Sequence, residues 1–135
     1  MYFDSHAHLD DEKFDGDRDR VAESLSEQEI SGVLNVCSSI EKIDVCLELA
    51  QKYDRIYAAV GVHPHEAALA TDEVLKRVSE VAQNPKVKAY GEIGLDYFHN
   101  FSPRDVQKRV FEVQINIAYG LKLPIVVHDR DAHQD

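Results

Sequence analysis

Four short motifs in the chain carry side chains that bind metal ions or take part in acid–base chemistry. They are residues 4–10 (DSHAHLD), 61–66 (GVHPHE), 91–97 (GEIGLDY) and 124–133 (PIVVHDRDAH). Each motif lies at the end of an apolar run or directly follows one. In parallel α/β folds, ligands bind at the carboxyl ends of the strands, so we expect the four motifs to meet at one rim.

The first motif places His6 and His8 two residues apart. On an extended strand such residues point to the same face, about 7 Å apart at the backbone, together with Asp4. Two imidazoles that converge in this way can share a divalent cation. The alternative is a pair of surface histidines in a turn.

The second motif holds His63 and His65 on either side of Pro64, which stiffens the turn. We expect His63 to contact a substrate phosphate or to serve as a further ligand. For His65 two interpretations remain open, a functional contact or simply the start of the following loop.

The third and fourth motifs supply a carboxylate and another imidazole. Glu92 lies in an apolar strand between Gly91 and Gly94, where an acid needs a cation or a hydrogen-bond partner to offset desolvation. The glycines allow another group to approach the backbone closely. His128 ends an uninterrupted apolar run, and Arg130 offers a bidentate fork for phosphate. An ion pair between Glu92 and Arg130 is the alternative for the carboxylate.

Four donors therefore form the predicted metal site: His6, His8, Glu92 and His128. This set suits Zn²⁺, Mn²⁺, Fe²⁺ or, with more oxygen ligands, Mg²⁺. Two cations roughly 3.5–4 Å apart can bind a nucleophilic hydroxide and stabilise the charge of an in-line phosphoryl displacement. Glu92 suits a bridging position between two such cations.

A repeated strand–helix rhythm provides the elements that must position these residues. Short runs rich in β-branched residues occur at 1–4, 32–36, 56–62, 87–93 and 123–128. They read as strands buried on both faces of a parallel sheet. Helical periodicity fills the intervals at 17–29, 43–50, 71–82 and 102–120. The alternation predicts an α/β fold, either an open doubly wound sheet or a barrel.

Local signals predict where two of these helices begin and end. Thr71 is expected to cap the third helix at its N-terminus, with acids in the first turn. Ser102 is expected to cap the fourth, with Pro103 at the first helical position and Gly120 ending it.

Composition limits the class of protein. The chain has 135 residues and a formal net charge of −10. This charge disfavours nonspecific binding of nucleic acid through a basic surface. No apolar run approaches the ~20 residues of a membrane helix, and the N-terminus does not resemble a secretory signal. Two cysteines form no disulfide framework. We therefore expect a cytoplasmic protein that has no membrane association and forms a single domain over residues 1–135.

Taken together, the four motifs resemble the successive signatures of the TatD-type metal-dependent deoxyribonucleases of the amidohydrolase superfamily. The resemblance runs over the whole chain. It implies a (β/α)₈ TIM barrel, two divalent metal ions (Mg, Mn or Zn), and hydrolysis of DNA phosphodiesters by a metal-activated water, commonly as a 3′→5′ exonuclease. By position, His6 and His8 match ligands of one metal and His128 a ligand of the other. Glu92 matches the bridging, catalytic carboxylate, and His63 a phosphate contact. Asp96 and Arg130 lie in family motifs.

A complete barrel of this type needs about 250 residues. The chain is thus expected to supply about the first four βα units plus the fifth strand. The family's later metal-ligand histidine and proton-transfer aspartate would lie outside it. Since general acid–base help is worth about 10²–10⁴ in rate, the fragment alone should be impaired. Unpaired barrel edges should also favour self-association.

Two other functions remain open. One is a metal-dependent hydrolase of the same superfamily with a substrate other than nucleic acid, because fold does not fix function. The other is a noncatalytic remnant that binds metal weakly or pairs with another chain.

Overall fold

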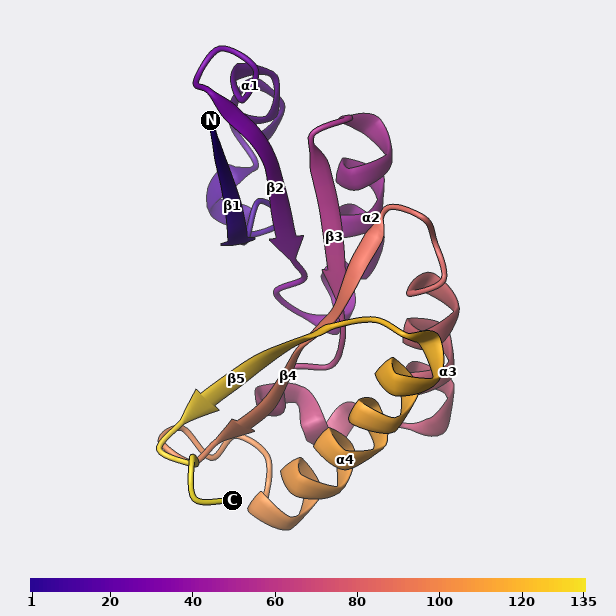
Figure 1. The fold of residues 1–135 in the computed structure, drawn as a ribbon. Coiled ribbons are helices and arrows are strands. Elements are labelled where there is room, and N and C mark those ends of the chain that lie inside the picture. Colours follow the sequence, from indigo (N-terminus) through magenta and orange to yellow (C-terminus); the bar gives the residue numbers. More distant parts are fainter.

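Five parallel strands lie side by side in chain order and curl into half of a barrel (Figure 1). The computed structural model describes all of residues 1–135. The strands are β1 (Tyr2–Ala7), β2 (Ile30–Val36), β3 (Ile56–Val60), β4 (Val87–Asp96) and β5 (Ile125–Arg130). A doubly wound sheet would reverse its strand order part-way. The uninterrupted order therefore selects the barrel alternative.

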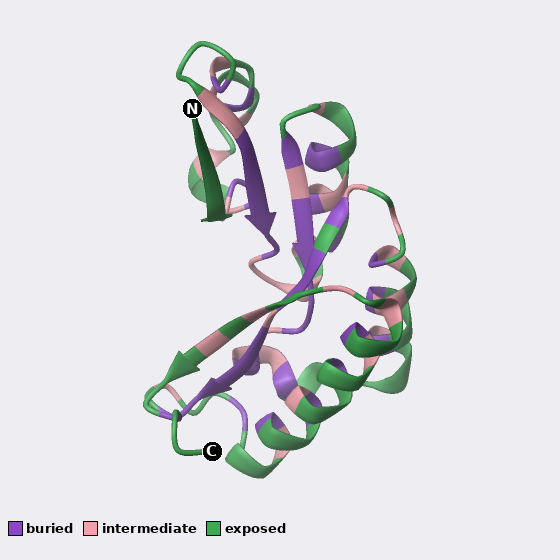
Figure 2. Cartoon of the chain, viewed as in Figure 1, coloured by how far each residue is buried: buried purple, intermediate pink, exposed green.

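The helices cover the outer, convex side of the sheet (Figure 1). They are α1 (Arg18–Ser24), α2 (Ile43–Lys52), α3 (Asp72–Val81) and α4 (Arg104–Leu121), with short 3₁₀ turns η1 (Glu12–Phe14), η2 (Ile40–Lys42) and η3 (Pro64–Leu69). The main core lies between the two layers (Figure 2). Ile43 and Val78 from the helices and Val60 and Ile93 from the strands are all fully buried there.

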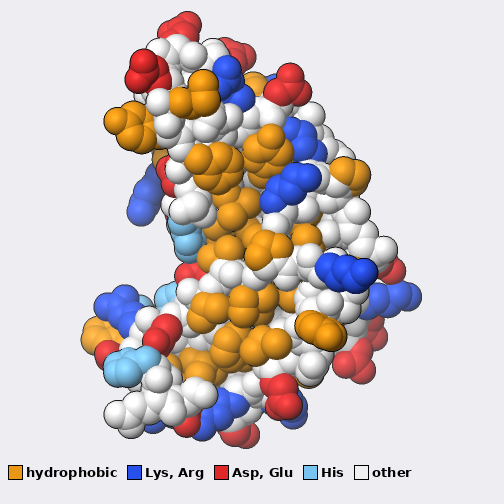
Figure 3. All heavy atoms as spheres, in the orientation of Figure 1, with side chains coloured by type: hydrophobic (Ala, Val, Ile, Leu, Met, Phe, Trp, Pro, Cys, Tyr) orange, Lys and Arg blue, Asp and Glu red, His pale blue; other side chains and the backbone are white.

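The inner, concave side of the sheet carries a second, smaller apolar cluster. Leu34, Val36, Ala59 and Ala89 form it. Figure 3 shows hydrophobic side chains gathered along the middle of the molecule in this view.

The two edge strands are largely exposed. Phe3 of β1 is 53% exposed and Val127 of β5 is 49% exposed. The prediction that every strand is buried on both faces is therefore wrong for β1 and β5. Each has a neighbouring strand on one side only, so less of its surface is covered.

The predicted N-cap of α3 is confirmed, whereas both predicted ends of α4 are wrong. The Thr71 hydroxyl accepts from the Val74 amide at 3.3 Å. Ser102 instead donates to the His65 carbonyl and accepts from the Ala68 amide, both at 3.0 Å, so Pro103 takes the capping position. Lys122, not Gly120, adopts the left-handed conformation that ends the helix, with φ 57°.

Helix α1 is shorter than predicted and ends at Ser24 rather than at Glu29. Residues 26–29 are all polar and exposed. They offer no apolar side chain to pack against the sheet, and a helix turn without that packing is weakly stabilised.

Strands β1, β4 and β5 end two or three residues later than predicted, which places His6 and Asp96 within the sheet and His128 two residues before the end of β5. No helix is both long and apolar enough to span a membrane.

Candidate metal centre

The last two strands approach each other at positions where only glycine fits. At Gly94, whose φ is +148°, an added Cβ would collide with the carbonyl oxygen of His128. At Gly91, with φ +154°, it would lie 2.6 Å from the Val126 carbonyl oxygen. The expectation of close backbone approach is confirmed. Gly94 is aligned with His128, so this contact brings His128 to the strand that carries Glu92.

Glu92 lies between two groups of histidines and directs one carboxylate oxygen to each. Its Oε2 is 3.4 Å from Nε2 of His6, and its Oε1 is 3.0 Å from Nδ1 of His128. The side chain is only 11% exposed. Donor atoms of His6, His8 and Glu92 all lie within 4.8 Å of one another. The structure therefore brings all four predicted donors together at the carboxyl ends of β1, β4 and β5.

His8 is oriented by a backbone carbonyl. Its Nδ1 lies 2.7 Å from the carbonyl oxygen of Val36, so Nδ1 must carry the proton of the neutral ring. The lone pair is then on Nε2. A histidine that donates one ring N–H to a carbonyl is typical of metal ligands, because this bond fixes the tautomer.

His63 precedes η3 and caps it. Its Nδ1 accepts from the His65 amide at 3.1 Å, which leaves the proton on Nε2. Nε2 lies 3.2 Å from Nδ1 of His128. Burial, together with the neighbouring rings of His128 and His65, lowers the pKa of His63 to about 4. At neutral pH His63 is therefore an uncharged hydrogen-bond donor at the edge of the site.

Asp96 joins three imidazoles that come from different parts of the chain. Its Oδ2 lies 2.7 Å from Nε2 of His65, 3.0 Å from Nε2 of His128 and 3.0 Å from Nδ1 of His99. The carboxylate is 1% exposed. Burial alone would raise its pKa, but hydrogen bonds from the backbone and ring of His99, from His65 and from His128 hold the pKa of Asp96 well below its usual range.

The sequence motifs did not predict these contacts between Asp96 and the three histidines. A signal was nevertheless present. Glu92, Gly94 and Asp96 alternate along one strand, so Asp96 shares a face with Glu92.

The donor set fits divalent cations. A neutral imidazole carries one N–H, yet His128 lies against a carboxylate at each ring nitrogen, Glu92 at Nδ1 and Asp96 at Nε2. If Nε2 donates to Asp96, the lone pair on Nδ1 faces both an oxygen of Glu92 and the Nε2–H of His63. Together with His6 and His8, the site gathers imidazole nitrogens around one carboxylate, and this donor set suits a divalent cation.

Arg130 lies away from Glu92. Its guanidinium carbon is 4.2 Å from the centre of the Phe98 ring, and Glu92 makes its close contacts with histidines. The alternative of a Glu92–Arg130 ion pair is therefore wrong. Arg130 remains exposed on the same rim as the histidines.

A hollow of about 380 Å³ opens beside the cluster. Its lining includes His8, Ser38, His63, His65 and Glu92. Histidines lie on both sides of the indentation in Figure 3. Glu66 also lines the hollow, but its Oε2 accepts from the Ile40 amide at 2.8 Å, which gives it a structural role.

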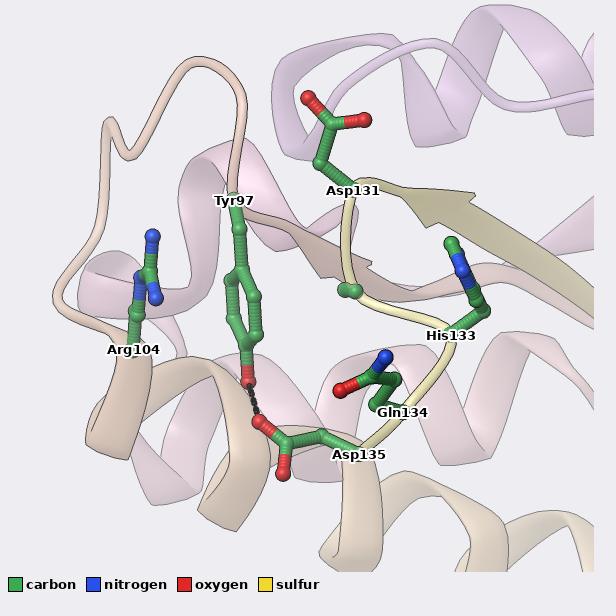
Figure 4. A pocket seen from close by; sticks show the side chains of 7 residues that line it. Tyr97, Arg104, Asp131, His133, Gln134 and Asp135 are labelled. Carbon is green, nitrogen blue, oxygen red and sulfur yellow. Dashed lines mark hydrogen bonds between the residues drawn. The ribbon is translucent and has the colours of Figure 1, made fainter.

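A second hollow, of about 390 Å³, lies between the loop after β4 and the last residues of the chain (Figure 4). Its labelled residues include Tyr97, whose hydroxyl donates to Asp135 at 2.9 Å, and Arg104. It contains none of the four metal-donor residues, and we assign it no part in the chemistry.

The chain is similar in sequence to a family of nucleases and to metal-dependent hydrolases. A family model described as "TatD related DNase" matches residues 3–135. An "Uncharacterized metal-dependent hydrolase YabD" from Bacillus subtilis is 42% identical over 135 residues, covering 100% of this chain and 53% of the relative. A "3'-5' ssDNA/RNA exonuclease TatD" from Escherichia coli K12 is 33% identical over 132 residues, covering 98% of this chain and 51% of the relative.

The crystal structure of YJJV, a TatD homolog from Escherichia coli K12, superposes with a TM-score of 0.88 at 28% identity. The match covers 98% of this chain and 52% of that structure. The chain thus spans about half the length of the curated relatives it matches.

Proposed function

The chain belongs to the TatD-related DNase family, and from this membership we propose that it provides metal-binding elements of a divalent-metal-dependent nuclease that hydrolyses DNA phosphodiesters as a 3′→5′ exonuclease. The observation that carries the proposal is the position of Glu92. Its two carboxylate oxygens face separate histidine groups, as a bridging carboxylate requires. A relative named as a 3'-5' ssDNA/RNA exonuclease supports the substrate class.

In this proposal Glu92 would be shared by two cations. His6 and His8 would help to hold one of them, and His128 would help to hold the other. Imidazole and carboxylate donors suit Zn²⁺, Mn²⁺ and, with added water ligands, Mg²⁺. When bound, the cations would supply Lewis-acid activation of water and neutralise charge on the phosphate.

The remaining groups of the site would bind and orient the substrate. His63 has a neutral Nε2–H that lies 3.2 Å from Nδ1 of His128, and with a cation bound by His128 this N–H would be available to donate to a phosphate oxygen. Arg130 offers a charged, planar fork on the same rim. Asp96 holds the ring of His128 through Nε2 and so keeps Nδ1 aimed at Glu92.

Binding and cleavage by the 135-residue chain test the proposal. Titration calorimetry with Mn²⁺ should show binding that Glu92→Gln weakens at least tenfold, whereas Glu112→Gln, the same change at an exposed position on α4, leaves it unchanged. A labelled single-stranded oligodeoxynucleotide should bind in the presence of Mn²⁺, and any hydrolysis should be lost in His6→Ala and Glu92→Gln. Undiminished cleavage in both variants would contradict the metal assignment. Mn²⁺ binding without DNA binding or cleavage would favour a substrate other than nucleic acid.

We also propose that the exposed edges β1 and β5 let the chain associate with a second copy of itself, and that the protein acts in the cytoplasm. The first proposal rests on the exposed apolar residues of these strands. The second is supported by two free, buried cysteines.

A further inference from the structure

Two phenylalanines are exposed in the loop that follows β4, beside the histidine cluster. Phe98 is 59% exposed and Phe101 is 67% exposed. Leaving such large apolar rings in water forgoes the stabilisation that burial would give. Most of the other strongly exposed aromatic residues lie on the edge strand β1, so this pair is a separate feature.

The rings are held in place rather than left on a loose loop. His99, between them, is fixed by two contacts with Asp96, from its backbone amide at 2.8 Å and from Nδ1 at 3.0 Å. Phe101 stacks on His99 with ring centres 5.1 Å apart and planes 30° from parallel. Asn100 adopts φ 50° and donates to the Tyr97 carbonyl at 2.6 Å, which sets the turn. The aromatic surface is therefore organised before any ligand binds.

This surface adjoins the proposed metal centre. The Phe101 ring makes an edge contact with His65 at 4.9 Å between centres. His65 in turn lies 4.3 Å from His63 and 5.8 Å from His128. One imidazole thus separates Phe101 from the residue proposed to contact phosphate.

A cation accompanies the rings. The guanidinium of Arg130 lies 4.2 Å from the centre of the Phe98 ring. Arg130 is exposed between Asp129 and Asp131, and its guanidinium places a positive charge directly beside the aromatic surface. Aromatic faces next to positive groups are the arrangement that binds single-stranded nucleic acid, since each base presents a π-face and each linkage a negative charge.

We propose that Phe98, His99 and Phe101, here called the aromatic rim, form a stacking platform for the bases of single-stranded DNA, while Arg130 and His63 contact the adjoining phosphates. The inference rests on the proposed nuclease function and specifies how its substrate is held. Stacking tolerates any base, so the platform predicts binding with little sequence preference. It also requires unpaired bases, because the faces of paired bases are already stacked within a duplex.

The test compares two ligands with equal charge. Fluorescence anisotropy measures binding of the 135-residue chain, in Mn²⁺, to a phosphorothioate-linked octathymidylate and to an octamer of the same backbone with abasic tetrahydrofuran residues. The phosphorothioate linkages slow hydrolysis. The variants are Phe98→Ala, Phe101→Ala and Phe101→Leu. The leucine variant keeps most of the apolar volume of phenylalanine but has no aromatic face. Tyr119→Ala serves as control, since Tyr119 is 85% exposed on α4.

Phe101→Ala should weaken octathymidylate binding about 5- to 100-fold, and Phe101→Leu should weaken it nearly as much. Binding of the abasic octamer should be weak for the parent and unchanged in the variants. Tyr119→Ala should bind both ligands as the parent does.

Octathymidylate affinity within twofold of the parent in both alanine variants would overturn the platform and leave the nuclease proposal standing. Equal weakening of both octamers would also overturn it, because stacking would then not be the cause. Failure of the parent to bind either octamer would instead remove the nuclease proposal and the platform with it.

Discussion

The side chain of Gln114 pairs with both polar groups of the Val62 backbone. Its Oε1 accepts from the Val62 amide at 2.7 Å, and its Nε2 donates to the Val62 carbonyl at 3.0 Å. Gln114 lies on α4 and is 1% exposed. A helix far along the chain thus fixes the segment that leads into His63, the proposed phosphate contact.

Replacing Gln114 with methionine should therefore destabilise the fold. The substitution keeps the volume but leaves two buried backbone groups unpaired, at about 1–3 kcal/mol for each. Urea unfolding measures the loss. Gln51→Met, on an exposed face of α2, should change the free energy of unfolding by no more than about 0.5 kcal/mol. A Gln114→Met chain as stable as the parent would show that these bonds contribute little.

Asp96→Asn should weaken metal binding although Asp96 is not among the four proposed ligands. The carboxylate orients His128 through Nε2, and loss of such a partner typically costs about 10- to 100-fold in metal affinity. Calorimetry with Mn²⁺ gives the affinity, and nitrogen-15 NMR of the imidazoles reports the tautomer of His128. Asp54→Asn, at an exposed turn, is the control. A purely structural role for Asp96 would lower stability without altering the tautomer of His128.

His63→Gln should separate substrate binding from metal binding. A neutral donor to a phosphate oxygen contributes about 1.5–3 kcal/mol, so the variant should bind single-stranded DNA about tenfold or more weakly. Its Mn²⁺ affinity should stay within about twofold of the parent. Parallel loss of both affinities would instead mark His63 as a metal ligand.

Both thiols should resist modification in the folded chain. Cys37 and Cys46 are 2% and 0% exposed, and the neighbouring Cys46 thiol together with burial raises the pKa of Cys37 far above its ordinary value of 9.0. A thiol-reactive disulfide reagent at pH 8 should label neither cysteine until urea is added. The folded state keeps a proton that the unfolded chain releases above pH 9, so this contribution to stability is complete below that pH and falls as the pH rises further. Rapid labelling of Cys37 or Cys46 in the folded chain would show that the thiols are not buried.

The edge strands should make the chain associate as its concentration rises. Val127→Lys on β5 and Phe3→Lys on β1 place charges on exposed apolar edges and should shift the population toward monomer. Sedimentation velocity measures the shift. Val113→Lys adds the same charge on α4, where Val113 is 39% exposed, and should leave association unchanged.

The strand–helix order and the meeting of the four proposed donors at one rim could be predicted from the sequence because both follow from local patterns. Alternating side chains on β1 and β4, and an apolar run that ends at His128, are visible in the residues themselves. The capping of α4 was missed because Ser102 satisfies the His65 carbonyl and the Ala68 amide, which lie more than thirty positions away in the chain. The role of Asp96 was missed for the same reason, since two of its three imidazole partners, His65 and His128, lie on distant segments.

The uninterrupted strand order bears on how the protein is made. Among these five strands, each pairs only with the strands before and after it in the chain, so none of these pairings awaits a distant segment. On the ribosome, β1 can pair with β2 as soon as β2 has emerged, and each later strand extends a sheet already in place. Assembly that proceeds from the N-terminus in this way keeps loop-closure entropy small at every step.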